Sequence, residues 1–296
     1  MAFNQEETPS LKAWGLLVLL AIIWGSSFIL IKKGLIALDS GEVGALRIVA
    51  AWLFLLPIAI KNISKISRKD LSVLITVGFA GTFIPAFLFA IAQTKLDSAL
   101  TGVFNALTPV WVLVLGIIFF SHIIHTRQVV GVFLGFLGSA LLILIGSNGS
   151  FENINYYALY VIAATVLYGC NLNIIKKYLG HLKGSVITAV SVLFVGPLAA
   201  IYLFSFTGFV DKMGVEPAFW EAFFYIILLG TMSTGIALII FNNLVQITTP
   251  IFTSSVTYLI PIVAIGWGIL DGEVLLISHY GAMTIILAGV YLVNKK

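Results

Sequence analysis

One arginine stands inside a long apolar stretch of this 296-residue chain. Arg47 is the one charged residue well within the run 42–60, which is long enough to cross a membrane. A charge at that depth costs several kcal/mol unless it is paired or hydrated, so it indicates a functional site by default. Its chemistry would be to bind the anionic group of a solute. The alternative is that Arg47, close to the start of its run, extends its side chain to the outer headgroups.

Amides, hydroxyls and aromatic rings also occur within apolar runs. Such polar groups are costly against lipid, so they must face other helices or water. Many will join helices through hydrogen bonds, which makes them packing residues. The others are expected to line a cavity, where rings contact the apolar part of a small polar solute and amides fix its polar groups. The candidate substrate-binding residues are Trp24, Arg47, Asn105, Trp111, Tyr168, Asn171 and Tyr258.

No enzymatic pattern accompanies these residues. The sequence has no G-x-S-x-G elbow, H-E-x-x-H helix or P-loop. His122 and His125 stand three apart without a cysteine or carboxylate close by in sequence, so we expect no metal site. Asp97, Asp271 and Glu273 lie at the ends of apolar runs, and no embedded carboxylate is present to couple protons to cation export. We therefore expect no enzyme activity, no cofactor, and a site that suits zwitterions, carboxylates or neutral polar solutes.

The composition requires a membrane protein. Hydrophobic residues make up 60% of the chain and charged residues 9%, whereas a soluble domain has roughly 25% charged residues. The single cysteine, Cys170, excludes an internal disulfide. We predict an all-α polytopic membrane protein with ten transmembrane helices. The predicted spans are 14–31, 42–60, 71–92, 99–120, 128–146, 156–175, 185–206, 219–241, 251–270 and 277–293.

The lysines and arginines orient these spans. With the N-terminus inside, 11 of them fall at inner positions and only 4 at outer positions, with Arg47 left within a span. This asymmetry predicts that both termini of the multi-pass protein are cytoplasmic. The basic residues sit at span ends, so the net charge of +4 is no sign of nucleic-acid binding. The outer basic residues are Lys32, Lys33, Lys95 and Lys212.

A sequence phrase occurs twice along the chain. Residues 24–33 reappear as 168–177, and each copy begins with an aromatic residue and glycine and ends with Ile-Lys-Lys. Five spans in each half is an odd number, so the second half would be inverted in the membrane. We therefore predict two homologous five-helix repeats, 1–147 and 148–296, related by a pseudo-two-fold axis in the membrane plane.

Two prolines occupy corresponding positions in these halves. Pro109 lies in the fourth predicted span and Pro261 in the ninth. Each removes a backbone donor and frees a carbonyl one turn earlier. Paired interruptions in two repeats indicate a substrate site near the midplane, so both are candidate hinges. The alternative is that they form ordinary kinks that shape packing.

The chain resembles the EamA-type, ten-span members of the drug/metabolite transporter superfamily over residues 14–294. The resemblance implies a bacterial inner-membrane carrier, usually an exporter of amino acids or related metabolites, without a bound cofactor. The chain departs from the family pattern in two places. Glu273, near the end of the ninth span, has no acidic counterpart at the end of the fourth span, where Ser121-His122 stand. Arg47 has Val190 near its equivalent place in the second half. The matching motifs are Ile22 to Phe28 with Lys32, Ala45-Leu46-Arg47, Ala99 to Val110, Gly131 to Gly138, Tyr258 to Pro261, and Gly272-Glu273.

The expected function is secondary transport of small polar metabolites such as amino acids. Transport would proceed by alternating access between the two inverted repeats, with export the expected direction. The lipid bilayer and a small-molecule substrate are the expected partners, and the oligomeric state stays open. The alternatives are a non-transporting membrane factor, a channel, or an exporter of drug-like compounds.

Overall fold

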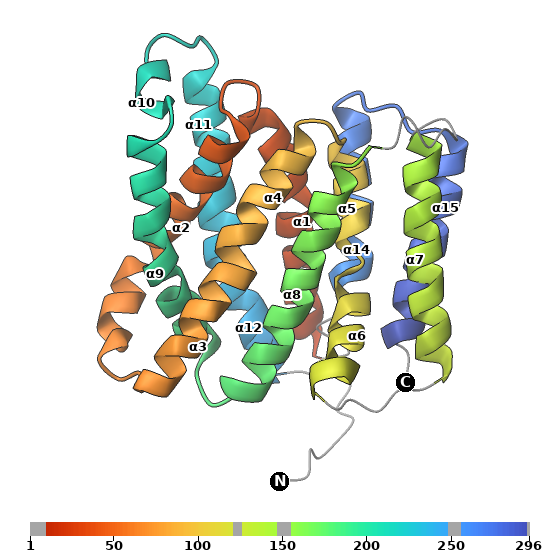
Figure 1. Ribbon diagram of the computed structural model, residues 1–296, viewed down its shortest axis with the longest axis horizontal. Helices are drawn as coiled ribbons and strands as arrows, with labels where there is room; N and C mark the ends of the chain where they lie inside the picture. Colours follow the sequence, from red (N-terminus) through yellow and green to blue (C-terminus); the bar gives the residue numbers. More distant parts are fainter. Residues whose placement is uncertain (1–9, 121–125, 147–154, 248–255, 295–296) are drawn as a thin grey trace.

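A computed structural model of the chain describes residues 10–120, 126–146, 155–247 and 256–294 (Figure 1). The described residues form helices and turns and contain no strand. The first half contains α1 (Leu11–Gly34), α2 (Ser40–Ile63), α3 (Arg68–Gly78), the π-helical turn η1 (Phe79–Phe83), α4 (Ile84–Gln93), α5 (Ser98–Asn105), α6 (Thr108–Phe120) and α7 (Thr126–Gly146). The second half contains α8 (Ala158–Tyr178), α9 (Gly184–Ser205), α10 (Phe209–Lys212), α11 (Phe219–Leu228), η3 (Leu229–Ile236), α12 (Ala237–Ile247), α14 (Val256–Leu270) and α15 (Ile277–Asn294).

Seven helical segments of the described chain are long and apolar enough to cross a membrane. Three further apolar helices are shorter, at Thr126–Leu142, Leu259–Leu270 and Ile277–Leu292. The protein is therefore a multi-pass membrane protein. These helices lie where the sequence predicts ten spans, and the exact count of ten stays a prediction.

Helix ends follow the capping preferences of the sequence. Ser10 caps α1 by accepting a hydrogen bond from the backbone N–H of Ala13 at 3.2 Å. Asp39 and Glu42 form a capping box at the start of α2. The first turn of α1 and the last turn of α15 lie at the lower end of the bundle in Figure 1, whereas the turn between α1 and α2 lies at the upper end. We call these the lower end and the upper end of the bundle.

Three long segments are irregular near their middle. The turns η1 and η3 interrupt 68–93 and 219–247 with π-helical geometry, which often marks functional sites. The segment 98–120 breaks between α5 and α6, just before Pro109. This break fits the predicted hinge at Pro109, because a proline ring disfavours helical backbone on its N-terminal side. Pro261 differs, since α14 continues through it.

Helices of the first half pack mainly on helices of the second. α2 packs on α9 and α7 packs on α15. α1 packs on α14 as α6 packs on α8, and α2 contacts η3 as α9 contacts α3. If each helix of the first half is exchanged for its counterpart in the second half, these helix pairs are reproduced. Two homologous repeats would give this pattern of contacts. The repeat relation itself stays a prediction.

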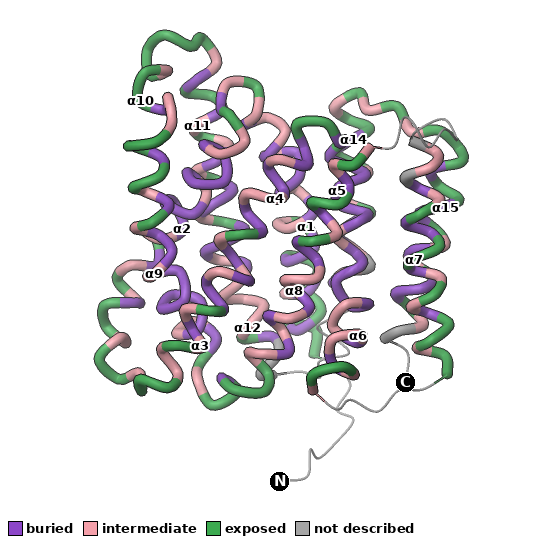
Figure 2. The backbone as a smooth tube through the Cα atoms, viewed as in Figure 1, coloured by how far each residue is buried: buried purple, intermediate pink, exposed green. Residues whose placement is uncertain are grey.

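Small residues allow the closest of these contacts. Gly289 on α15 lies against the backbone of Gly131 and Gly135 on α7, where an added Cβ would overlap main-chain atoms. The G-x-x-x-G pattern on α7 therefore serves packing within this chain. Buried residues occupy the faces between helices, while large apolar side chains such as Phe133 and Phe204 are exposed on the periphery (Figure 2). That distribution suits a surface that faces lipid rather than water.

Candidate functional site

Arg47 extends from α2 toward the middle of the bundle. Its Nε donates a hydrogen bond to Thr234 Oγ1 of η3 at 2.9 Å. Gly230 of η3 lies so close to the Arg47 carbonyl that an added Cβ would overlap it, which holds α2 and η3 together at this point. The guanidinium therefore lies beside the middle of segment 219–247. The depth of Arg47 in the membrane stays a prediction.

Trp24, on α1, binds the same π-helical turn. Its Nε1 donates to the Ser233 carbonyl at 3.1 Å, and its ring lies 5.1 Å from that of Phe241. The Ser27 and Ser233 hydroxyls are 2.6 Å apart and share a hydrogen bond. Trp24 and Arg47 are thus attached to consecutive residues of η3. A sequence signal for η3 exists in hindsight, because residues 230–235 place two glycines and three hydroxyls within an apolar run.

Tyr168, on α8, completes this group. Its side chain and that of Arg47 are close enough to interact electrostatically, and its ring stacks on Phe89 of α4 at a centroid distance of 5.9 Å. We call Trp24, Arg47, Tyr168, Ser233 and Thr234 the central site. In the part of the chain that the structure describes, no carboxylate forms an ion pair with Arg47. The central site can therefore offer an uncompensated positive charge, aromatic surface and hydroxyls to a bound anion.

Asn171 lies one helical turn after Tyr168 on α8. Its side chain is 9% exposed and packs against Gly81 of η1. It lines a cavity of about 40 Å³ between α3, η1, α8, α9 and α12. Phe241 also lines this cavity and contacts the Trp24 ring, which connects the cavity to the central site.

The other three predicted residues are not joined to this group. Asn105 and Trp111 make no hydrogen bond or ring contact with the central site among the described residues, although Asn105 Oδ1 and Trp111 Nε1 are buried without a described partner. Trp111 packs its ring edge-on against Phe136 of α7. The side chain of Tyr258 lies outside the described residues. A role in binding for these three stays a prediction.

A cluster of ion pairs closes the upper end of the bundle. Lys32 Nζ lies 2.8 Å from Asp271 Oδ2 and 2.8 Å from Glu273 Oε1, and Lys33 also pairs with Asp271. The Glu273 side chain is only 1% exposed. In the predicted orientation these lysines lie outside, which is contrary to the positive-inside bias. Their acidic partners follow α14, more than 230 residues later in the chain. We call Lys32, Lys33, Asp271 and Glu273 the upper ion cluster.

Glu273 also caps the start of α5. It accepts hydrogen bonds from the Ser98 N–H at 2.9 Å, the Ser98 hydroxyl at 2.6 Å and the Ala99 N–H at 3.0 Å. Burial disfavours its charged form, but the hydrogen bonds from Lys32, Ser98 and Ala99 outweigh burial and lower the pKa of Glu273. Hydrogen bonds from both lysines lower the pKa of Asp271 as well. One carboxylate thus ties α1, α5 and the turn after α14 together.

A second ion group holds the turn before α11 to the start of α2. Lys212 Nζ lies 2.8 Å from Asp39 Oδ2 and 2.7 Å from Glu42 Oε2, and the Glu42 side chain is fully buried. Burial opposes the charge on Lys212, but these two carboxylates outweigh it and raise the pKa of Lys212. At the lower end, the ion pair found among described residues is His181–Asp70 at 3.3 Å, which is partly exposed. The two ends are therefore held by unequal charge networks.

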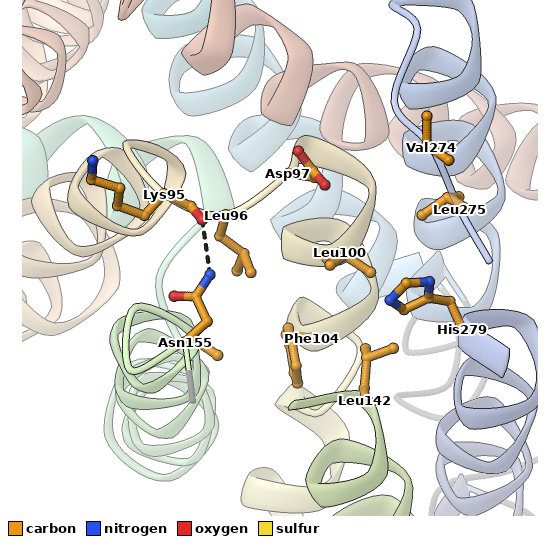
Figure 3. Close-up of a pocket in the computed structure, with 11 residues that line it drawn as sticks. Lys95, Leu96, Asp97, Leu100, Phe104, Leu142, Asn155, Val274, Leu275 and His279 are labelled. Carbon is orange, nitrogen blue, oxygen red and sulfur yellow. Dashed lines mark hydrogen bonds between the residues drawn. The ribbon is translucent and has the colours of Figure 1, made fainter. Parts of the chain in front are cut away.

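A cavity of about 190 Å³ lies beside the upper ion cluster. His279 projects from α15 toward Leu142, and its Nδ1 accepts a hydrogen bond from the Leu276 N–H at 3.0 Å (Figure 3). Burial and the nearby Glu273 charge raise the pKa of Asp97, which lies at the rim. None of the central-site residues lines this cavity. Its lining combines apolar side chains with Lys95, Asp97, Asn155 and His279, and it leaves room for water or a small solute.

The described residues contain no group of three or more histidine, cysteine or carboxylate side chains that could hold a metal ion. His122 and His125, which the sequence argues against as a metal site, lie outside the described residues.

Comparison with known proteins supports one family. The model of the EamA-like transporter family matches the chain twice, at residues 11–144 and 155–295. An uncharacterized transporter of Archaeoglobus fulgidus is 28% identical over 172 residues, which are 57% of this chain and 60% of that protein. A solved structure described only as the crystal structure of a protein has a TM-score of 0.63 at 14% identity, covering 95% of this chain and 96% of that one. The last similarity concerns the fold alone.

Proposed function

This chain belongs to the EamA-like transporter family, and from that premise we propose that it is a secondary transporter that exports small polar metabolites such as amino acids. The observation that carries the substrate class is Arg47, a guanidinium inside the helix bundle with no carboxylate partner among the described residues. A charge in such surroundings is stabilised when an anionic group binds beside it. The substrate is therefore a carboxylate or zwitterion. The transporter has no bound cofactor and no enzyme activity.

The mechanism we propose is alternating access between two inverted repeats, 1–147 and 148–296. The double family match and the exchanged pattern of helix contacts support this division. The irregular middles of segments 68–93, 98–120 and 219–247 support bending around a site near the midplane. The hinge at Pro109 lies at one of these bends, whereas Pro261 would act only through the freed carbonyl one turn earlier.

The resting state we propose is closed outside. The upper ion cluster and the Lys212 group lie at the end that the positive-inside rule assigns to the outside, while the lower end has one partly exposed pair in the described chain. Closing the outer end more firmly than the inner end favours loading from the cytoplasm. This supports export as the direction.

Topology provides a direct prediction. In a Cys170→Ser background, Glu216→Cys should react with an impermeant thiol reagent added outside intact cells, because residue 216 lies in an exposed turn at the upper end. Lys65→Cys, in the turn between α2 and α3, should react only after the inner membrane is opened. Reaction of both cysteines from the same side would contradict cytoplasmic termini and the inner-membrane orientation.

Transport itself is tested in proteoliposomes. A thermal-shift screen against amino acids, other carboxylates and drug-like compounds first identifies a ligand, since a ligand stabilises the folded protein by RT ln(1 + [L]/Kd). We expect saturable flux of that ligand, accelerated by unlabelled ligand on the opposite side. Conductance without this counterflow would identify a channel, and an absence of flux would identify a non-transporting factor. If only drug-like compounds stabilise the protein in this screen, the proposed substrate class changes from metabolites to drug-like compounds.

A further inference from the structure

Asn171 and Ser27 occupy the same position in the repeated phrase, yet their surroundings differ. Ser27 meets η3, where its hydroxyl shares a 2.6 Å hydrogen bond with Ser233. Asn171 meets the other π-helical turn, η1, at Gly81. Its Oδ1 is buried and has no hydrogen-bond partner among the described residues. One copy of this contact is therefore satisfied within the protein, and the other presents an unpaired acceptor.

The unpaired oxygen belongs to a cavity of about 40 Å³. That space exceeds the ~10–15 Å³ that a cavity needs to hold one water, so it admits a group of the size of water or ammonium. Every side chain that lines it is neutral. The lining residues are Val77, Gly81, Thr82, Asn171, Leu172, Ile175, Ile187, Thr188, Ser191, Leu238, Phe241 and Asn242.

Several donors in this lining are already used within the protein. Thr188 donates its hydroxyl proton to the Gly184 carbonyl, and Ser191 donates to the Thr188 carbonyl. Asn242 Nδ2 donates to Thr188 Oγ1 at 2.9 Å, and the Asn171 Oδ1 acceptor is buried without a partner among the described residues. A primary ammonium brings three N–H donors, which can satisfy this oxygen and neighbouring acceptors of the lining.

The cavity and Arg47 are connected through Phe241 and Trp24. The Phe241 ring lines the cavity and lies 5.1 Å from the Trp24 ring, while Trp24 and Arg47 bind the consecutive residues Ser233 and Thr234 of η3. The Phe241 ring contributes to the cavity wall and can also attract a cation. A molecule with an anionic end at Arg47 could therefore place its other end in the cavity.

We propose that the Asn171 cavity binds the ammonium end of a zwitterionic substrate whose carboxylate is held by Arg47. This inference rests on the proposed transport function and narrows its substrate class. It assigns the cavity a positive-end subsite built from neutral oxygens. Because no central-site residue lines the cavity, the proposal places the two charges of the substrate farther apart than in an α-amino acid. Substrates with the amino group several bonds from the carboxylate fit this spacing best.

The test compares amino acids with matched acids that lack the amino group. The probes are 3-aminopropanoate, 4-aminobutanoate and 6-aminohexanoate, each against propanoate, butanoate or hexanoate, with Kd measured by calorimetry on the purified full-length protein. We expect at least one amino probe to bind about tenfold more tightly than its partner, as expected for hydrogen bonds to a charged group. Asn171→Leu should remove that difference, and Asn171→Asp should keep it.

Matched controls separate this subsite from folding and from the central site. Asn243→Leu makes the same chemical change at an exposed position of α12 and should leave the difference intact. Gly81→Ala should reduce the difference, because the added Cβ would displace the Asn171 amide. The unfolding midpoint without ligand checks that each variant is folded.

Each outcome bears on one claim. Equal binding of amino and amino-free probes, or an unchanged difference in Asn171→Leu, would overturn the ammonium subsite. Stabilisation by NaCl but not choline chloride, lost in Asn171→Leu, would assign the cavity to a free sodium ion and overturn it too. If Arg47→Ala leaves the binding of every carboxylate unchanged, the failure lies in the proposed anion site instead.

Discussion

Arg47→Ala is expected to weaken binding of an anionic or zwitterionic substrate by about 10- to 100-fold, which corresponds to one or two hydrogen bonds to a charged group. The guanidinium is held by Thr234 inside the helix bundle and has no carboxylate partner among the described residues. Its removal therefore takes away the anion's partner without leaving an acidic side chain unpaired. Calorimetric Kd values and flux per folded molecule in proteoliposomes measure the effect.

The matched control is Arg127→Ala, which removes an exposed arginine at the start of α7. We expect substrate affinity to stay within about twofold of wild type there, because an exposed charge far from the substrate is screened by water and salt. The substrate affinity of Arg47→Lys should lie between those of wild type and Arg47→Ala, since lysine keeps the charge but lacks the planar guanidinium that can donate two parallel hydrogen bonds. Unchanged flux in Arg47→Ala would show that the arginine only holds α2 to η3.

Glu273→Gln is expected to lower the midpoint of thermal unfolding by roughly 4–8 °C. Removing one partner of a buried ion pair costs about 3–5 kcal/mol of stability. We expect a smaller loss here, about 2 kcal/mol, because Lys32 still pairs with Asp271 in the variant and its side chain is one-third exposed. In a protein of this size, the unfolding midpoint falls by roughly 2–4 °C for each kcal/mol of stability that is lost. The measurement is thermal unfolding in detergent, with Glu216→Gln as the exposed control, which should shift the midpoint by less than about 2 °C.

The same variant changes the response to acid. Because the pKa of Glu273 is lowered in the folded protein, its ion pair and hydrogen bonds contribute stability above the unfolded pKa, and this contribution is lost as the pH falls through the folded pKa. Asp271 acts in the same direction, whereas the raised pKa of Asp97 acts in the opposite one. Wild type should lose more stability than Glu273→Gln between neutral pH and about pH 3. Parallel losses would contradict the assigned role of Glu273.

The fold was largely predictable because membrane spans depend on local composition. Runs of apolar residues place the helices within a few residues, as for the predicted span 71–92 against the observed segment 68–93. The irregular turns were less accessible. Both turns contain glycine, Gly81 in η1 and Gly230 in η3, but a π-helical turn depends on how one extra residue is accommodated against neighbouring helices.

The candidate site was predictable in part. An isolated charge in an apolar run is conspicuous, so Arg47 could be found, and the repeat led to Trp24 and Tyr168. Their partner Thr234 could not be found, because contacts between residues 187 positions apart depend on tertiary packing. Glu273 was recognised only as the end of a span. Its contacts with Lys32 and Ser98 arise from helices that meet only after both halves are in place.

The pairing across the upper ion cluster also sets an order of events during synthesis. Asp271 follows Lys33 by more than 230 residues, which takes roughly 10–50 s at common rates of translation. In the orientation we propose, two lysines stand on the outer side during that interval without their acidic partners, where they oppose correct insertion of the first helix. Lys12, Lys61, Lys65 and the basic residues just after them lie on the inner side in that orientation and favour correct insertion. A ribosome that stops after the first half would release a chain whose orientation is less securely fixed than that of the full protein.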